Sequence, residues 1–253
     1  MKKHIKLVTL GAMFLSANAF AGGGCDDTFS AWDSVNTGAN PLNDVSTTDV
    51  NPLEGNCSLS VPLELGGKRY VQDDMDQETS FRMSFKIDPN SFPMPTAGAD
   101  RRIKVASVLC VDGGNGCAVS SGGTPNFQGV WQTKLRQQPT GYKLGSWIQG
   151  TDGTRISHTL DLVDGCNSVE IQFIAGNPGT YKMWVNNNDE NSPDFDVTTV
   201  DPALDLSGAF TDTARIGKTA FGAEMIGDTP GAFMLMDSYE SRRQTFIGNT
   251  CAP

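Results

Sequence analysis

Histidine is nearly absent from this chain of 253 residues, which contains only His4 and His158. A Cys-x-x-Cys pair is also missing, so the ligand spacing of common zinc sites does not occur. His158 alternates with Ile156 and Leu160, a pattern that favours an inward-facing side chain. No serine lies in a Gly-x-Ser-x-Gly motif. These absences argue against a zinc enzyme and against a serine hydrolase that uses His158 as its base.

Long apolar runs are scarce as well. Beyond residue 21, no run approaches the roughly 18 to 20 apolar residues that cross a bilayer. Residues 1–21 combine three lysines, a short apolar stretch over 7–15 and the small residues Ala19 and Ala21. This arrangement is typical of a bacterial secretory signal peptide. We therefore expect an exported protein, extracellular or periplasmic, with no membrane span.

Basic residues are outnumbered, with 19 Lys and Arg against 29 Asp and Glu and a formal net charge of −10. Removal of residues 1–21 would delete three lysines and no acidic residue, so the mature chain would be more acidic still. Such a surface repels nucleic acid and anionic lipid headgroups, and we expect neither as a partner. The composition fits a secreted protein, or one that collects divalent cations.

Cysteine is present in an even number, and all six residues follow the leader. In an exported chain this predicts up to three disulfides, with 15 possible pairings. Proximity favours one pair, because a short Gly-rich loop separates its two cysteines, and closing that loop would contribute about 2.5 kcal/mol. A lipid anchor at Cys25 is disfavoured, because Gly22 stands where a lipoprotein site has a leucine-like residue. The pairs we favour are Cys110–Cys117, Cys25–Cys57 and Cys166–Cys251.

Strand-like alternation dominates the chain after residue 57. Residues 22–56 are rich in Asp, Asn, Thr, Gly and Pro without a period, which predicts a loop-rich lead-in. Residues 80–87 then place four apolar side chains on one face and polar ones on the other. No segment has a helical period over three turns. We expect further strands over 58–65, 102–111, 126–137, 142–148, 155–162, 168–175, 180–185 and 233–239.

These regularly spaced strands predict an all-β fold, an antiparallel two-sheet sandwich formed by a single domain over residues 57–253. The most distinctive segment of the sequence is GAFMLMDSYESRRQTFIG at residues 231–248. It resembles the closing strand of concanavalin A-like (laminin-G-like) jelly-roll domains of secreted bacterial proteins. The resemblance implies a structural hydrogen-bonding role for Asp237, with Arg242 or Arg243 as an ionic partner. The same sandwich carries lectins, glucanases and scaffolding modules, so function must come from the site.

The loop at residues 186–196 is the candidate functional loop. It concentrates asparagine amides and aspartate carboxylates, the oxygen ligands that Ca²⁺ prefers. Asp189, Asp194 and Asp196 are the candidate metal ligands. The spacing does not match an EF-hand, and Asn and Asp are also ordinary turn formers, so a plain hydrophilic loop is the alternative.

Trp184 precedes this loop and is out of phase with Met183 and Val185. It can therefore point away from the core, beside the acidic loop, where a flat aromatic face could stack on a sugar. Asn186, Asn187 and Asn188 are the polar groups expected to accompany it. The alternative is that Trp184, like Trp131 and Trp147, belongs to the core.

Paired carboxylates for glycoside hydrolysis are not evident. The acidic run at residues 73–78 lacks the spacing that retaining enzymes need, and we interpret it as a solvated turn. Glu170 alternates outwards on its strand. We therefore expect a non-catalytic carbohydrate- or surface-binding module whose partner is a glycan or another cell-surface component. A structural envelope protein is the second hypothesis, and a glycoside hydrolase or polysaccharide lyase is the third.

Overall fold

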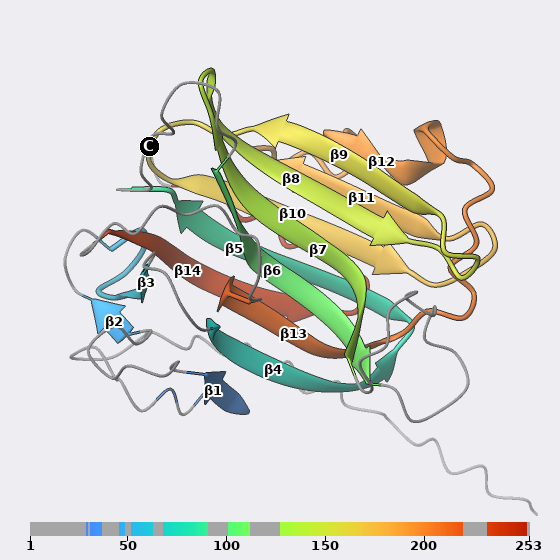
Figure 1. Ribbon diagram of the computed structural model, residues 1–253, viewed down its shortest axis with the longest axis horizontal. Helices are drawn as coiled ribbons and strands as arrows, with labels where there is room; N and C mark the ends of the chain where they lie inside the picture. Colours follow the sequence, from blue (N-terminus) through green and yellow to red (C-terminus); the bar gives the residue numbers. More distant parts are fainter. Residues whose placement is uncertain are drawn as a thin grey trace, which may run out of the picture.

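The computed structural model describes residues 29, 31–36, 46–48, 52–62, 68–90, 101–111, 127–219 and 232–251. These residues form two seven-stranded antiparallel sheets that pack face to face (Figure 1). Sheet A has the spatial order β1 (Ser34–Asn36), β4 (Arg69–Glu78), β13 (Thr211–Lys218), β6 (Arg101–Val111), β7 (Phe127–Gln138), β8 (Gly141–Gln149) and β9 (Arg155–Asp161). Sheet B has the order β12 (Phe195–Asp196), β11 (Thr180–Val185), β10 (Asn167–Ile174), β5 (Ser80–Asp88), β14 (Phe233–Arg242), β3 (Ser58–Pro62) and β2 (Ser46–Thr48). The expected all-β antiparallel sandwich is confirmed.

The core lies between the sheets and is built by alternate residues of each strand. On β5, Phe81, Met83, Phe85 and Ile87 are fully buried among the inward side chains of both sheets. Burying each of these side chains contributes about 1.5 to 3 kcal/mol. Strand β5 is central in sheet B, so its apolar face has neighbours on every side.

Aromatic contacts join the two sheets along the β7–β11 side of the sandwich. The rings of Trp131 on β7 and Tyr181 on β11 are 6.0 Å apart, and the Tyr181 hydroxyl hydrogen-bonds to Ser146 on β8. At the outermost strands, His158 on β9 stacks on Phe195 of β12, with ring centroids 4.3 Å apart. Burial lowers the pKa of His158. The predicted inward position of His158 is therefore confirmed, and its ring packs against the opposite sheet at this edge of the sandwich.

Five strands lie where the sequence did not predict them, namely β1, β2, β4, β12 and β13. Strands β1 and β2 fall within the lead-in at residues 22–56 and add to the edges of sheets A and B. Both are short and polar, so their pairing with β4 and β3 defines them rather than their own pattern. Strand β13 is central in sheet A, but only Ala214 and Ile216 mark its inward face. Such small apolar contributions do not produce a strong alternation.

The acidic run at residues 73–78 forms the second half of β4, so its interpretation as a turn is wrong. Asp73 links the two sheets, because its Oδ2 accepts a hydrogen bond at 3.0 Å from the hydroxyl of Tyr239 on β14 of sheet B. Ser241, also on β14, donates to the same oxygen at 3.4 Å. Burial raises the pKa of Asp73 despite these hydrogen bonds. One carboxylate of the run is therefore structural.

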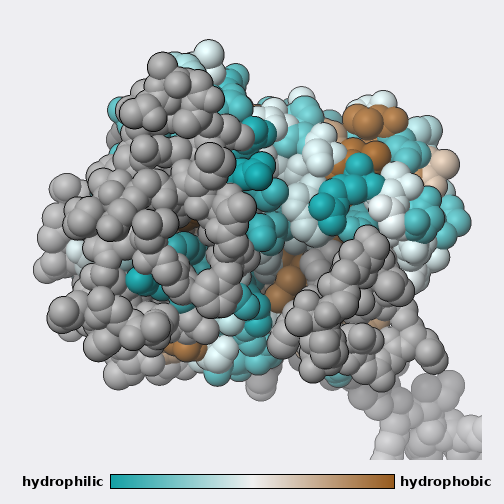
Figure 2. Space-filling view, viewed as in Figure 1, coloured by the Kyte–Doolittle hydropathy of each residue, from teal (hydrophilic) through white to brown (hydrophobic). Residues whose placement is uncertain are grey.

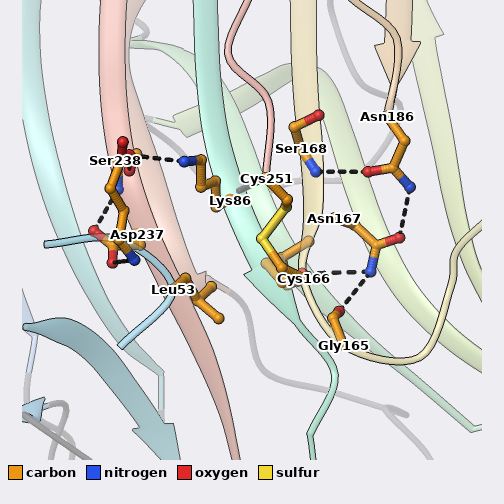
Figure 3. Close-up of a disulfide and its surroundings, with 12 residues drawn as sticks. Leu53, Lys86, Gly165, Cys166, Asn167, Ser168, Asn186, Asp237, Ser238 and Cys251 are labelled. Carbon is orange, nitrogen blue, oxygen red and sulfur yellow. Dashed lines mark hydrogen bonds and ion pairs between the residues drawn. A yellow bond between two sulfur atoms is a disulfide. The ribbon is translucent and has the colours of Figure 1, made fainter. Parts of the chain in front are cut away.

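The disulfide predicted between Cys166 and Cys251 is present, with a Cα–Cα distance of 5.9 Å (Figure 3). Cys57 and Cys110 are each disulfide-bonded as well, while Cys25, Cys117 and residues 1–21 lie outside the described residues. Disulfides persist in oxidising compartments, so they are compatible with an extracellular protein. Within the part of the chain that the structure describes, no helix has the length and hydropathy to cross a membrane.

Candidate ligand-binding face

Trp184 is not the exposed sugar-stacking residue that we expected. It does lie on the outer face of sheet B, opposite Met183, but only 1% of its surface is exposed. Its Nε1 donates to the Asp189 carbonyl at 3.0 Å, and its ring packs edge-on against Phe246. The C-terminal segment therefore covers the face that a sugar would have used.

The accompanying amides are largely engaged within the protein. The Asn186 amide oxygen accepts from the Ser168 backbone N–H at 2.9 Å, and its nitrogen donates to Asn167. The Asn187 amide nitrogen donates to the Ser192 carbonyl at 2.7 Å. Asn188 is exposed. Asn186 and Asn187 thus shape the loop, which is the ordinary role of asparagine in turns.

The structure does not bring the three candidate calcium ligands together. Asp189 accepts from the Asn191 backbone N–H, and Asp194 accepts from the Val185 backbone N–H. Asp196 caps the short 3₁₀ turn η2 (Val197–Thr199) and forms an ion pair with Lys182 at 3.2 Å. Among the residues described, no group of three or more His, Cys, Asp or Glu side chains converges to hold a metal. In this loop the three aspartates form turns and caps, and calcium binding stays a prediction.

The C-terminal segment at residues 243–251, here called the strap, lies over the outer face of sheet B. Glu170 on β10 accepts hydrogen bonds from the backbone N–H groups of Ile247 and Gly248 at 3.0 and 2.9 Å. Arg82 on β5 forms a buried ion pair with Glu170 at 2.8 Å. Its guanidinium lies 5.1 Å from the Trp184 ring centroid and 5.2 Å from that of Phe246.

The other side of the same face is covered by residues 52–57. Asp237 accepts hydrogen bonds from the Ser58 hydroxyl and the Glu54 backbone N–H, and Lys86 pairs with Glu54 at 2.7 Å (Figure 3). The expected structural role of Asp237 is therefore confirmed, but its expected ionic partner is wrong. Arg242 pairs with Glu240, and Arg243 pairs with Glu78. Residues 52–57 on one side and the strap on the other thus cover the outer face of sheet B.

The outer face of sheet A carries a concentration of basic side chains. On each strand these residues alternate with core residues, as Lys134 and Arg136 flank buried Leu135 on β7. The same alternation places Arg102 and Lys104 on either side of Ile103 on β6. We call this surface the cationic face and define it by Lys68, Arg102, Lys104, Lys134, Arg136, Lys143, Arg155 and Arg215.

Antiparallel pairing brings like charges directly opposite one another on this face. Arg102 on β6 faces Arg136 on β7, which in turn faces Lys143 on β8. Lys104 on β6 likewise faces Lys134 on β7. Lys143 is balanced by an ion pair with Asp161 on β9, but like charges at directly opposite positions destabilise a sheet. Such an arrangement is expected where a surface binds an anion.

The pKa values of two lysines on this face are lowered in part by the neighbouring cations. Burial lowers the pKa of Lys134, and the charges of Arg102, Lys104, Arg155 and Arg136 lower it further. At the other end, burial lowers the pKa of Lys68, with further contributions from Arg215 and Lys104. Lys134 and Lys68 are therefore each close enough to their basic neighbours to be repelled by them.

Aromatic and amide groups lie among the cations. Gln132 donates to the Ser107 hydroxyl at 3.0 Å and accepts from Trp147 Nε1 at 3.3 Å. The guanidinium of Arg155 lies 4.2 Å from the Trp147 ring centroid.

At the β4 side, Arg215 donates to Gln72 at 2.7 Å and lies 4.5 Å from the ring centroid of Tyr70.

Hydrophilic side chains predominate on the described part of the surface seen in Figure 2, and hydrophobic ones form only small, separate patches. The cationic face combines fixed cations with hydrogen-bonding groups and one partly exposed tryptophan.

No family model matches the sequence, and no curated protein matches it at a significant level. Solved structures do match the fold. Alginate lyase Aly36B is 12% identical, with a TM-score of 0.56 over 89% of this chain and 93% of the lyase. The binding domain of botulinum neurotoxin serotype D is 11% identical, with a TM-score of 0.50 over 85% of this chain and 44% of the toxin chain. At such low identity these likenesses show the β-sandwich fold alone.

Proposed function

We propose that this protein binds an acidic polysaccharide on the cationic face of sheet A. The observation that carries the proposal is the gathering of cations on one sheet face of a chain whose net charge is −10. Because the rest of the molecule must be correspondingly acidic, this face is the place where a polyanion can approach without repulsion. Arginine and lysine are the residues that recognise carboxylates, through charge-assisted hydrogen bonds.

The composition of the face favours a sugar among possible polyanions. Trp147 is partly exposed and offers an apolar surface for a sugar ring. The closed outer face of sheet B supports the choice of sheet A. In two structural neighbours the bound ligand is itself acidic: a lyase variant in complex with an alginate trisaccharide (TM-score 0.57) and a serotype D toxin domain in complex with N-acetylneuraminic acid (TM-score 0.50).

The proposal places the protein outside the cytoplasm, as a member of the concanavalin A-like class of exported sandwiches. The signal-peptide pattern of residues 1–21 supports export, and the disulfide between Cys166 and Cys251 supports an oxidising compartment.

Calorimetric titration with alginate and with neutral dextran tests the proposal. We expect alginate to bind and dextran not to bind. The double variant Lys134→Gln/Arg136→Gln should weaken alginate binding at least tenfold, with a native thermal transition. Lys182→Gln removes one charge from sheet B and serves as the matched control, with an unchanged affinity. Equal binding of dextran, or full affinity in the double variant, would contradict the proposal.

A polysaccharide lyase is the second candidate, and the lowered pKa of Lys134 favours it. A lysine whose pKa is lowered gives up its proton more readily and is a better candidate for a general base, and surrounding cations could stabilise the anion that forms when a proton is removed beside a carboxylate. β-Elimination would leave an unsaturated uronate, whose ultraviolet absorbance is easily followed. Absorbance that rises with the wild type and not with Lys134→Gln would favour the lyase, whereas binding without any rise would favour the binding module.

A further inference from the structure

Strand β9 forms one edge of sheet A, along the border of the sandwich in Figure 1, and no described strand pairs with its outer side. The edge strands β1, β2 and β12 have three, three and two residues, whereas β9 has seven. Native proteins commonly protect an exposed edge with a very short strand, proline, lysine or a β-bulge. Strand β9 contains neither proline nor lysine, and its pairing with β8 has no register shift. This edge is therefore open to a further strand.

The hydrogen-bond phase of β9 shows which of its backbone groups are free. At the end of the pairing with β8, the Leu162 N–H donates to the Tyr142 carbonyl. Because hydrogen-bonded positions alternate along an antiparallel pair, Ile156, His158 and Leu160 also direct their backbone groups to β8. The intervening residues direct their N–H and C=O groups to the outer side of the strand: Arg155, Ser157, Thr159 and Asp161.

The residue order of β9 is complementary to itself when two copies run antiparallel about His158. Arg155 then faces Asp161 of the second copy, so opposite charges meet on the outer face of the sheet. Ser157 likewise faces Thr159 of the second copy. These four residues are the ones with outward backbone groups, so each facing pair can exchange both of its N–H···O bonds.

Arg155 and Asp161 each keep a free hydrogen-bonding group for this contact. Lys143 pairs with Oδ1 of Asp161, whose side chain is 80% exposed, so Oδ2 can accept from Arg155 of the second copy. Arg155 is exposed, and its guanidinium is held over Trp147 while its Nη2 donates to Gln149 at 2.8 Å. This leaves Nη1 and Nε free to donate.

The inner face of β9 is complementary as well. Ile156 and Leu160 pack against the core but stay partly exposed at the edge, and each would face the other across the two copies. The two His158 residues would face each other at the centre, each with its ring stacked on Phe195 of its own copy. Burial lowers the pKa of His158, so the two imidazoles are neutral at pH 7 and do not repel each other. Pairing would therefore extend the core from one copy to the next.

We infer that β9 pairs with β9 of a second copy, and that the resulting symmetric dimer joins two copies of sheet A into one continuous sheet. The two-fold axis passes through His158, perpendicular to the sheet. An axis at Ser157 would place Arg155 opposite Thr159 and lose the ion pair, so the charges favour His158 as the centre. The inference goes beyond the proposed function. If both hold, the two cationic faces lie on the same side of the joined sheet, and one long polymer can bind both.

Sedimentation equilibrium of the wild type, Ser157→Pro and the control Ser157→Ala tests the dimer. The Ser157 N–H points to the outer side, so proline removes a hydrogen bond to the second copy and none within the sheet. We expect the wild type to dimerise at micromolar concentrations and Ser157→Ala to do so within about threefold of the wild-type affinity. Ser157→Pro should dimerise at least about a hundredfold more weakly, with a native thermal transition.

Charge reversal tests the register and does not depend on the proline variant. Asp161→Arg and Arg155→Asp each place like charges opposite one another and should weaken the dimer about tenfold. The double variant Arg155→Asp/Asp161→Arg restores opposite charges and should return to within about threefold of the wild-type affinity. Asp76→Arg, an exposed change on β4 away from β9, is the control and should leave the affinity unchanged.

Three results would overturn the inference. The first is a wild type that stays monomeric up to about 1 mM. The second is a folded Ser157→Pro that dimerises as strongly as Ser157→Ala. The third is a double charge reversal that dimerises as weakly as the single variants, which would show that Arg155 and Asp161 do not face each other. These measurements contain no polysaccharide, so their failure would leave the proposed function untouched.

Discussion

Lys104 on β6 and Lys134 on β7 lie directly opposite each other on the outer face of sheet A. Two cations at facing positions weaken the pairing of their strands, because each raises the electrostatic free energy of the other. A sheet selected for stability alone would place an acidic or neutral residue at one of these positions. Under the proposed function, the charge of this surface serves binding at some expense of stability.

Replacing one member of this pair should stabilise the fold. We expect Lys134→Gln to raise the free energy of unfolding by about 0.2 to 1 kcal/mol at low salt, because it removes repulsion from Lys104 and its neighbours. The gain should shrink at high salt, where the charges are screened. Urea denaturation at two salt concentrations measures both effects. A loss of stability at low salt would show that Lys134 is held by favourable interactions that outweigh the repulsion.

The buried ion pair between Arg82 and Glu170 should be the most sensitive polar contact of sheet B. We expect Glu170→Gln to destabilise the protein by about 3 to 5 kcal/mol, because it leaves the Arg82 charge buried with only the more distant, exposed Glu190 beside it. The control is Arg243→Ala, which breaks a more exposed pair with Glu78 and should cost less than about 1 kcal/mol. Similar unfolding midpoints for the two variants would contradict this account.

The disulfide between Cys166 and Cys251 should hold the strap on sheet B. It closes a loop across 85 positions of the sequence, so we expect the double variant Cys166→Ser/Cys251→Ser to lose about 2 to 5 kcal/mol. Release of the strap should also expose Trp184 and shift its fluorescence to longer wavelength. Fluorescence of the variant under native conditions checks this, and an unchanged spectrum would mean that Arg82 and Glu170 retain the strap without the covalent bond.

The position of Asp73 between the sheets should make stability depend on pH. Burial raises the pKa of Asp73 in the folded state, so the folded protein holds this proton more tightly than the unfolded chain does. Stability from this group is therefore present at low pH and falls as the pH rises from the ordinary aspartate range through the raised value. We expect Asp73→Asn to flatten this decline, as measured by urea midpoints across acidic pH. Asp76→Asn, an exposed change on the same strand, is the control for the loss of one charge.

The sequence predicted the architecture well, because most of the strands can be recognised from the pattern of their own residues. The alternation over residues 80–87 is sufficient to identify β5, and the phase of Trp184 against Met183 correctly placed its ring on the outer face. Its burial could not be predicted, because Phe246, the strap residue that packs against its ring, lies more than 60 residues away in the sequence. The contact between Trp184 and Phe246 exists only after the sheet has formed.

The cationic face shows the same division between local and long-range information. The patterns Arg102-Ile103-Lys104 and Lys134-Leu135-Arg136 assign basic side chains to the polar face of two strands. That these faces are the same surface follows from the pairing of β6 with β7, whose register contains two irregularities. The acidic net charge does not reveal this face, because it averages over all faces of the molecule.

The most direct test of the central claim is a nuclear magnetic resonance titration of the protein with a polyuronate, following the backbone amide shifts. The account predicts that the largest shifts lie on β6, β7 and β8, around Arg102, Lys134 and Lys143, and that sheet B is little affected. Shifts concentrated in the loop at residues 186–196 or under the strap, or no shifts at all, would contradict it.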